Sequence, residues 1–417
     1  MRALKIAVPA VVATAAVSAL VVAPGLWRAS VDGSPRAALP TGPPPPAPVA
    51  VVVGLHAGVV PWDAPLRLAV SHGVLVSVSV AVSDATGGVL PGAVAAGGSR
   101  WASSTTLVPL TTYRASIVIH GLDGRDHDDE LTARAADAAS HLDVILSPGD
   151  GDIVGVGQPA IVYLNHWVPD AERAAVEERL SVATTPAVTG AWHWMSGQEV
   201  HWRPKTYWAP GTTVAIHSDL RNLDVGGGVW GTGVHTATFM IGDAHISIAD
   251  VAAHLMRVYS NGQLVRTLKI SAGRLKYPTQ GGVYIALEKD PMVVMDSQTV
   301  GIPRNSPDGY YEKVYWDVRL SYGGTFVHAA PWSVQSQGVD NVSHGCINVS
   351  PADAQWFYNF ARRGDVVKVV NSAIGPNLSD PGMEDWNLDW QQWLAGDALP
   401  PAPSPSPSAP AAYRWRP

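Results

Sequence analysis

The segment NVSHGCINVS (341–350) contains Cys346, the only cysteine among the 417 residues. The thiolate is the nucleophilic form, and an unassisted thiol is mostly protonated at neutral pH, so a catalytic cysteine needs a nearby base. Two histidines are candidates: His344 lies two residues before Cys346, and His328 lies 18 residues before it. This pattern predicts nucleophilic catalysis. The alternative is a buried, unreactive cysteine, because free cysteine is among the most buried residue types.

The two histidines differ in the elements that must position them. His328 ends the predicted strand of GGTFVHAAPW, and a neighbouring strand can bring its imidazole beside the thiol. His344 lies in a tight turn with Gly345, where successive backbone N–H groups can converge on a developing negative oxygen. We therefore expect His328 to be the base and the turn to contribute an oxyanion hole.

A helix is predicted directly after the cysteine loop. Ser350 is the expected N-cap, Pro351 the first helical position, Asp353 the capping-box acid, and Gly364 the stop. Upstream, two alternating runs joined by Asn261-Gly262 predict a tight hairpin. Further strands are expected in GGVYIALEK, PMVVMDS and KVYWDVRLSYGGTFVHAA.

The region before this unit reads as β-sandwich. Segment 74–82 alternates, and a period of two predicts a half-buried strand with five valines on one face: Val74, Val76, Val78, Val80 and Val82. A repeat, W-x7-P-x-T-T, starts at Trp101 and again at Trp202, 101 residues later. That spacing is the size of one immunoglobulin-like sandwich, so we expect two such modules. DAERAAVEERL (170–180) predicts a short helix inside the second module.

The chain ends carry low-complexity and apolar segments. Arg2 and Lys5 precede an uncharged run of 18 residues, 6–23, which indicates export. A cleaved signal peptide and an uncleaved membrane anchor both remain open. Residues 32–50 are a Pro-rich spacer, and 400–417 predict a disordered tail. In an exported protein, a lone thiol is a liability unless it is buried or used.

Composition excludes several classes of partner. The net charge of −7 argues against nucleic acid and anionic lipid. The acidic run DGRDHDDE lacks the spacing of a calcium loop, GVGQP near 155 is too short for a nucleotide fingerprint, and neither H-E-x-x-H nor C-x-x-C occurs. No metal or cofactor is predicted.

Three tryptophans mark the last ordered piece, MEDWNLDWQQWLAG. Trp386, Trp390 and Trp393 are spaced i, i+4, i+7, which predicts one face of a helix. We interpret the segment as a docking helix packed against the preceding domain. A ligand platform is the alternative.

The core SHGCIN, with the upstream HAAPW, resembles the L,D-transpeptidases with a YkuD-type catalytic fold. The resemblance covers roughly 240–395 and includes the upstream plan of an export segment and two immunoglobulin-like modules, as in the long mycobacterial-type members. It implies a cysteine acyltransferase of peptidoglycan synthesis. The thiol would attack the third residue of a donor stem tetrapeptide and release D-Ala. An acceptor stem would then form a 3→3 cross-link, and carbapenem β-lactams would inactivate the enzyme.

The same resemblance assigns residue roles. Cys346 is the nucleophile and His328 the base, oriented by the main-chain carbonyl of Ala329, while the N–H groups of His344, Gly345 and Cys346 form the oxyanion hole. The positions matching the substrate cleft and its lid (297–325) are Tyr310, Met295, Gly323, Gly324, Trp332, Ser343 and Asn348. Close relatives carry Ser in place of Ala329, so a hydroxyl contact is lost here. Packing roles for Met295 and Trp332 are the alternative.

We therefore predict a mainly β protein: two immunoglobulin-like sandwiches, a YkuD-type β-rich catalytic domain and a C-terminal Trp-rich docking segment. The expected boundaries are 1–28 (signal or anchor), 29–50 (linker), 51–147, 148–238, 239–371 (catalytic), 372–399 (docking) and 400–417 (tail). The expected location is the periplasm or cell wall, with membrane contact through the N-terminal segment alone. A carboxypeptidase or endopeptidase, and a non-catalytic wall-binding scaffold, are the competing functions.

Overall fold

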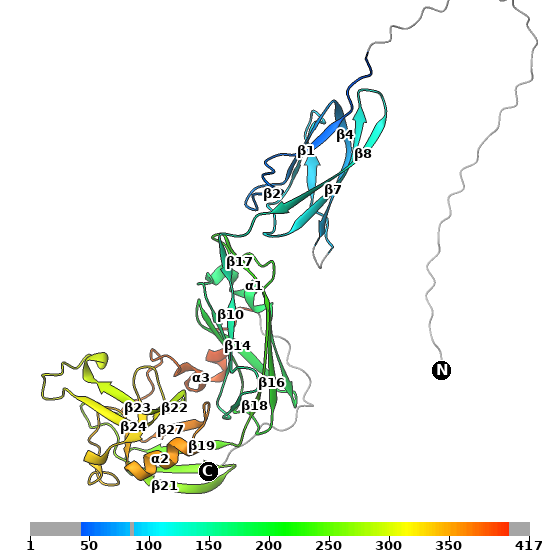
Figure 1. Cartoon of the computed structure of the whole chain (residues 1–417). Coiled ribbons are helices and arrows are strands. Elements are labelled where there is room, and N and C mark those ends of the chain that lie inside the picture. Colours follow the sequence, from blue (N-terminus) through cyan, green and yellow to red (C-terminus); the bar gives the residue numbers. More distant parts are fainter. Residues whose placement is uncertain (1–42, 84–86, 400–417) are drawn as a thin grey trace, which may run out of the picture.

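The computed structural model describes residues 43–83 and 87–399. Three hydrophobic cores follow one another along the chain, and Figure 1 shows the corresponding bodies arranged in series. Within this described part, no helix has the length and apolarity needed to cross a membrane. The predicted signal or anchor and the predicted tail lie outside the described residues.

The first body is a sandwich of two four-stranded sheets, with strand orders β1-β3-β6-β5 and β2-β8-β7-β4. Its core contains the fully buried Tyr113 and the buried Trp101. The strands are β1 (Val49–Val52), β2 (Val59–Val60), β3 (Arg67–Ser71), β4 (Gly73–Ser83), β5 (Gly92–Val94), β6 (Arg100–Ser103), β7 (Thr112–Gly121) and β8 (Asp126–Ala135).

The second body repeats this plan. Its sheets have the orders β10-β12-β15-β14 and β11-β18-β16-β13, so each strand has a counterpart in the first sandwich. The predicted helix near 170–180 forms as a 3-10 turn followed by α1. The elements are β9 (Ser140–Leu142), β10 (Val144–Ser147), β11 (Ile153–Val154), β12 (Ala160–Leu164), η1 (Asp170–Glu172), α1 (Arg173–Glu177), β13 (Leu180–Thr185), β14 (Gly190–Ser196), β15 (Glu199–Pro204), β16 (Thr213–Asp219), β17 (Val229–Gly231) and β18 (Val234–Ile241).

The W-x7-P-x-T-T repeat falls on matching elements of the two sandwiches. Trp101 lies on β6 and Trp202 on β15, and each is buried. A Cβ on Gly92 would lie 2.1 Å from the Trp101 ring, and a Cβ on Gly190 would lie 2.3 Å from the Trp202 ring. Each tryptophan therefore packs over a glycine of the neighbouring strand, and the duplication extends to side-chain packing.

One prediction for the first sandwich is wrong. In β4, Val74 and Val76 are exposed, and Leu75 between them is buried. The pairing of β4 with β7 shifts register between Leu75 and Ser77, which is a β-bulge. An extra residue in a strand exchanges the two faces, so the first two valines point to solvent while Val80 is buried.

The third body contains two sheets, ordered β21-β20-β19-β27-β22 and β23-β24-β25-β26. Helix α2 packs against β24 and β25. The elements are β19 (His245–Asp250), β20 (Leu255–Ser260), β21 (Gln263–Lys269), β22 (Gly282–Ile285), β23 (Glu288–Asp296), η2 (Ser297–Val300), β24 (Tyr311–Arg319), β25 (Phe326–Ala329), η3 (Pro331–Ser333), β26 (Ile347–Val349), α2 (Pro351–Phe360) and β27 (Val366–Val370).

Local signals in this body predicted the hairpin and the helix start. Asn261 and Gly262 join β20 to β21 with φ of 48° and 82°, as a tight two-residue turn requires. The Ser350 hydroxyl accepts the Asp353 N–H at 3.1 Å and so caps α2. The predicted stop at Gly364 is wrong, because α2 ends at Phe360 and the next residue is extended.

The C-terminal segment forms two short helices, α3 (Glu384–Asn387) and α4 (Trp390–Leu394), instead of the single predicted helix. Asp389 starts α4 with a complete capping box, which ends the preceding helical turn. All three tryptophan rings nevertheless lie against Arg203 of β15, with the guanidinium carbon 4.3 to 5.4 Å from the ring centroids. The segment packs on the second sandwich and also bonds β22, where the Asn387 amide donates to Val283 O.

The glycines of GVGQP permit close contact between the second sandwich and the third body. Gly155 N–H donates to Arg363 O at 2.7 Å, and Gly157 N–H donates to Gly364 O at 2.9 Å. A Cβ on Gly155 would lie 2.2 Å from the Asp365 nitrogen. Because glycine has no side chain, these residues let the backbones of the two domains come close enough to hydrogen-bond.

Candidate active site

Two adjacent parallel strands position the cysteine and the predicted base. In the pairing of β25 with β26, Val327 is opposite Ile347 and His328 is opposite Asn348. Because alternate residues of a strand share a face, Cys346, just before β26, lies on the same side as Asn348 and His328. The strand pairing thus brings two residues 18 positions apart to one side of the sheet.

A cavity of about 280 Å³ opens at this point. Cys346 and His328 line it together with His344. Five of the predicted substrate-binding residues also line it: Met295, Tyr310, Trp332, Ser343 and Asn348. The remaining two, Gly323 and Gly324, do not line it. Gly324 O is 3.4 Å from the Cys346 sulfur, whereas the Gly323 N–H is turned away and donates to Asp380 Oδ1 at 2.7 Å.

His328 is held as a neutral imidazole with a defined tautomer. Its side chain is buried, and Nδ1 lies 3.0 Å from Ala329 O. A carbonyl oxygen can only accept, so Nδ1 carries the hydrogen and Nε2 keeps its lone pair. Burial lowers the pKa of His328 to about 4, and the bond to Ala329 offsets only part of that shift. At neutral pH the ring is a proton acceptor.

The thiol is also neutral in this state. Burial, with a smaller contribution from the charge of Asp317, raises the pKa of Cys346 to about 12. The residue itself is half-buried and lines the cavity, where the thiol donates to Gly324 O. A protonated thiol and an unprotonated imidazole therefore coexist, so that proton transfer must accompany nucleophilic attack.

Residues 343–346 form a turn held from both sides. The Ser343 hydroxyl donates to Cys346 O at 2.6 Å and accepts the Gly345 N–H at 3.1 Å. Thr279 donates to Gly345 O at 2.8 Å. Gly345 has φ of 127°, and a Cβ there would meet no atom within 4 Å, so backbone conformation alone requires glycine. One of the three predicted oxyanion amides is thus engaged by Ser343.

The hydrogen bonding of the His344 side chain does not suit a general base. Its Nε2 accepts from Arg274 Nη2 at 2.8 Å, which uses the lone pair. The ring lies near Tyr277 and Tyr310, with centroid separations of 5.1 and 4.9 Å. Burial, and then the charge of Arg274, lower the pKa of His344. A backbone role for His344 in the oxyanion hole stays a prediction.

Sequence reasoning missed an ionic cluster at the rim of the cavity. Asp308, in the predicted lid, lines the cavity and accepts from Arg274, Lys276 and Tyr277. No motif singles out these residues, because Asp308 is 34 positions from Arg274 in the chain. Three-dimensional proximity alone identifies them.

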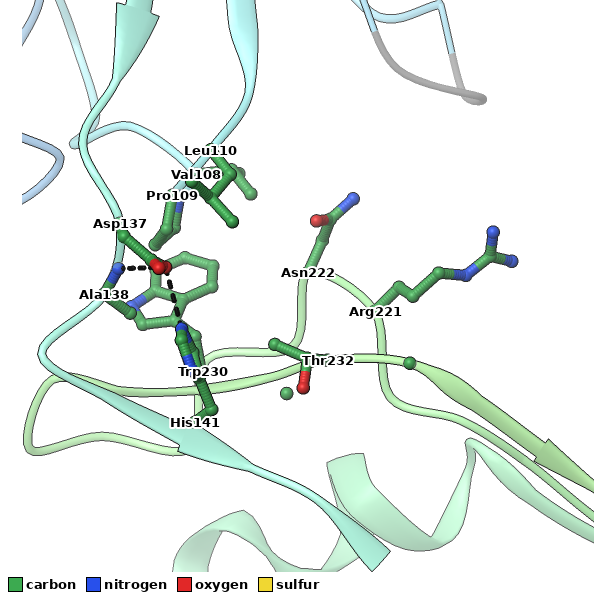
Figure 2. A pocket seen from close by; sticks show the side chains of 12 residues that line it. Val108, Pro109, Leu110, Asp137, Ala138, His141, Arg221, Asn222, Trp230 and Thr232 are labelled. Atoms are coloured by element: carbon green, nitrogen blue, oxygen red, sulfur yellow. Dashed lines mark hydrogen bonds and ion pairs between the residues drawn. The ribbon is translucent and has the colours of Figure 1, made fainter. Parts of the chain in front are cut away.

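A second cavity, of about 160 Å³, lies between the two sandwiches and shares no lining residue with the cavity at Cys346. Figure 2 shows Leu110 and Asp137 of the first sandwich facing Trp230 and Asn222 of the second, with the Asp137–His141 bond drawn dashed. The sequence singled out none of these residues. They include no cysteine, so the cavity around Cys346 remains the candidate active site.

Comparison with known proteins identifies the domains and the family of the chain. Residues 57–224 match the bacterial Ig domain, and residues 244–369 match the L,D-transpeptidase catalytic domain. The chain is 39% identical over 336 residues to L,D-transpeptidase 2 of Mycobacterium tuberculosis (strain CDC 1551 / Oshkosh), which covers 81% of each protein. It is 40% identical over 225 residues to L,D-transpeptidase 1 of strain H37Rv, covering 54% of this chain and 83% of that protein.

Among solved structures, L,D-transpeptidase LdtMt1 in complex with imipenem is similar with 40% identity and a TM-score of 0.48. The match covers 54% of this chain and 98% of that one. L,D-transpeptidase 3 of M. tuberculosis with a faropenem-derived adduct is similar with 35% identity and a TM-score of 0.47, over 54% and 97%. The identity of 39% over four-fifths of both chains decides the family. With two immunoglobulin-like sandwiches before a YkuD-type catalytic domain, the chain belongs to the L,D-transpeptidase family.

Proposed function

We propose that the protein cross-links peptidoglycan through a thioester on Cys346. The donor is a stem tetrapeptide ending in D-Ala, and the bond formed joins the third residues of two stems. The observation that supports the proposal is that paired strands bring Cys346 and His328 to one open cavity, the thiol protonated and the imidazole neutral. A scaffold that only binds glycan has no need of this pair.

In the first step, His328 Nε2 takes the thiol proton as the sulfur attacks the carbonyl carbon of the third residue. The imidazolium then returns that proton to the amine of D-Ala, which leaves, and a thioester remains on Cys346. Ala329 O holds the Nδ1 hydrogen throughout, so the ring keeps its orientation. The lost hydroxyl of a serine at position 329 does not enter this step.

The developing oxyanion is stabilised by amides of the 343–346 turn. The N–H groups of His344 and Cys346 supply donors, and that of Gly345 joins them when it leaves the Ser343 hydroxyl. Preorganised amides of this kind are worth about 10²–10³ in kcat for each donor removed. The conformation of the turn therefore matters as much as the nucleophile.

In the second step, the side-chain amine of an acceptor stem attacks the thioester. His328 accepts the proton of that amine, the sulfur leaves, and the thiol is restored. Water in place of the amine gives hydrolysis, which is the carboxypeptidase or endopeptidase alternative. A carbapenem takes the donor's place, because its β-lactam carbonyl acylates the same sulfur. These reactions place the protein at the cell wall, outside the cytoplasm.

The test uses disaccharide-tetrapeptides and mass spectrometry of the products. Dimers that have lost one D-Ala support cross-linking, and tripeptides alone support hydrolysis. Cys346→Ala gives neither product, and because the thiol contributes little to the core, its thermal unfolding matches that of the unchanged protein. Intact substrate in both samples would refute enzymatic function and leave the scaffold reading.

A further inference from the structure

One guanidinium nitrogen joins the predicted lid to the cysteine turn. Arg274 Nη2 lies 2.5 Å from Asp308 Oδ1 and 2.8 Å from His344 Nε2. Asp308 belongs to the segment between η2 and β24, and His344 precedes Cys346 by two residues. A single side chain thus bonds two residues that line the cavity, one from the predicted lid and one from the cysteine turn.

The Asp308 carboxylate is held by three groups of the 274–277 segment. Besides Arg274, the Lys276 ammonium and the Tyr277 hydroxyl donate to its Oδ2, the latter at 3.1 Å. By contrast, Arg304 of the same segment bonds Asp296, at the base of the lid. Among the described ion pairs, Asp308 is therefore the lid residue that bonds the 274–277 segment.

Arg274 also fixes the turn through its own backbone. Its N–H donates to Ser343 O at 3.0 Å, and Gly273 forms a bridge with Ser343. The backbone of this loop and the side chain of Arg274 thus hold the first two residues of the turn, Ser343 and His344.

We propose that Arg274 is a positioning residue. Held by Asp308 of the closed lid, its guanidinium fixes His344 and so keeps the 343–346 turn in the conformation that accepts an oxyanion. Opening of the lid withdraws Asp308 and releases this restraint, which couples lid closure to reactivity toward carbonyls. The inference rests on the proposed acyl transfer, because only a carbonyl substrate needs the oxyanion amides.

The distinction between attack on a carbonyl and simple alkylation tests this role. Imipenem acylates a thiol through a tetrahedral oxyanion, whereas iodoacetamide alkylates it without one. In the full chain, Arg274→Met is expected to slow imipenem acylation about 10- to 100-fold, as a misplacement of about 1 Å does. Alkylation of Cys346 stays at the rate of the unchanged protein. Asp308→Asn slows acylation less and speeds alkylation, because the open lid exposes the sulfur.

A matched control is Arg266→Met. The Arg266–Asp353 pair has a 2.7 Å contact and side-chain exposures of 36% and 22%, close to the 30% and 20% of Arg274 and Asp308. It lies away from the cavity, so both rates are expected to be unchanged. Arg274→Lys retains a donor and should recover part of the acylation rate.

A second readout does not depend on turnover. Donation by Arg274 to Nε2 requires the Nδ1-protonated tautomer of His344, which nitrogen NMR detects. In Arg274→Met this tautomer preference is expected to fall, and the pKa of His344 to rise. Equal slowing of acylation and alkylation, or an unchanged acylation rate, would overturn the inference. Failure of the unchanged protein to react with imipenem would instead overturn the proposed function.

Discussion

The two immunoglobulin-like sandwiches share a strand order but differ in how they are joined to the rest of the chain. The first meets the second through an edge-to-face pair, Trp62 and Trp230, with centroids 5.8 Å apart, and through the open cavity of Figure 2. The second shares its core with the catalytic domain, since Ile246 and Val366 belong to the same hydrophobic cluster. One fold thus serves as a spacer in the first position and as a support in the second.

Two histidine–aspartate pairs show the same difference between an exposed first junction and a buried second one. At the first junction, His141 Nε2 lies 2.7 Å from Asp137, and the side chains are 43% and 50% exposed. At the second, His201 Nδ1 lies 2.7 Å from Asp385 of the docking segment, with exposures of 4% and 2%. The two distances are equal, but the electrostatic interaction energies differ, because water screens the exposed pair and not the buried one.

The largest predicted effect is that of truncation on solubility and stability, which should differ between the two sandwiches. A chain that begins at residue 138 loses the first sandwich and should remain soluble, with the unfolding midpoint of the catalytic domain nearly unchanged. A chain that begins at residue 239 exposes the shared core and should aggregate or fail to fold. Circular dichroism melts and gel filtration measure both. A stable, soluble catalytic domain from the shorter chain would contradict the supporting role of the second sandwich.

The histidine pairs provide the next test. Asp385→Asn leaves the buried imidazolium of His201 with Glu199 as its only charged partner, and we expect a loss of about 3–5 kcal/mol in the free energy of unfolding. Asp137→Asn, the matched change at the first junction, should leave unfolding unchanged. Urea titration of both variants gives the comparison. Similar losses would show that burial does not distinguish the junctions.

The pH dependence of stability sharpens this contrast. Burial alone would lower the pKa of His201, but the charges and hydrogen bonds of Asp385 and Glu199 outweigh it and raise the pKa from 6.5 to about 10. A pKa raised on folding stabilises the protein fully below about pH 6.5, and that contribution is lost as the pH rises through 10. Unfolding measured from pH 7 to 10 should show this loss, and Asp385→Asn should flatten the slope. A pH-independent stability would contradict the charged pair.

The smallest effect concerns matched turns of the repeat. Leu110 has φ of 58° in the first sandwich, and its counterpart Gly211 has φ of 79° in the second. A left-handed backbone costs about 1–2 kcal/mol for an L-residue, so Gly211→Ala should destabilise by about 1 kcal/mol. Leu110→Gly should stabilise the first sandwich slightly, because it relieves the same strain. Thermal melts of both variants decide the point, and a stabilising Gly211→Ala or a destabilising Leu110→Gly would show that the two turns are not equivalent.

Much of the fold was predictable because its signals are local. The turn residues Asn261 and Gly262, the cap Ser350 and the tryptophan repeat each act within a few positions of the chain. The bulge after Leu75 has no such signal, and the α3–α4 break depended on an Asp389 cap that the tryptophan spacing concealed. Local pattern therefore predicted which elements form better than where they bend or end.

The candidate site also has features that the sequence predicted and features that it did not. The spacing around Cys346 predicted that the thiol and His328 come to one cavity, because strand pairing converts that spacing into proximity, whereas the other lining positions came from the family resemblance. Arg274 and Asp308 could not be predicted, since they lie 70 and 36 positions before His344 and meet it only after folding. Likewise, the engagement of the Gly345 amide by Ser343 depends on side-chain orientation within a turn.

The central claim is that the Cys346 sulfur becomes acylated with His328 as its base. The most direct measurement is the intact mass of the full chain after brief mixing with a disaccharide-tetrapeptide, followed by peptide mapping. We predict an added mass equal to the donor less D-Ala, located on Cys346, absent in Cys346→Ala and strongly reduced in His328→Ala. An adduct of that mass on any other residue, or one that survives in Cys346→Ala, would contradict the account.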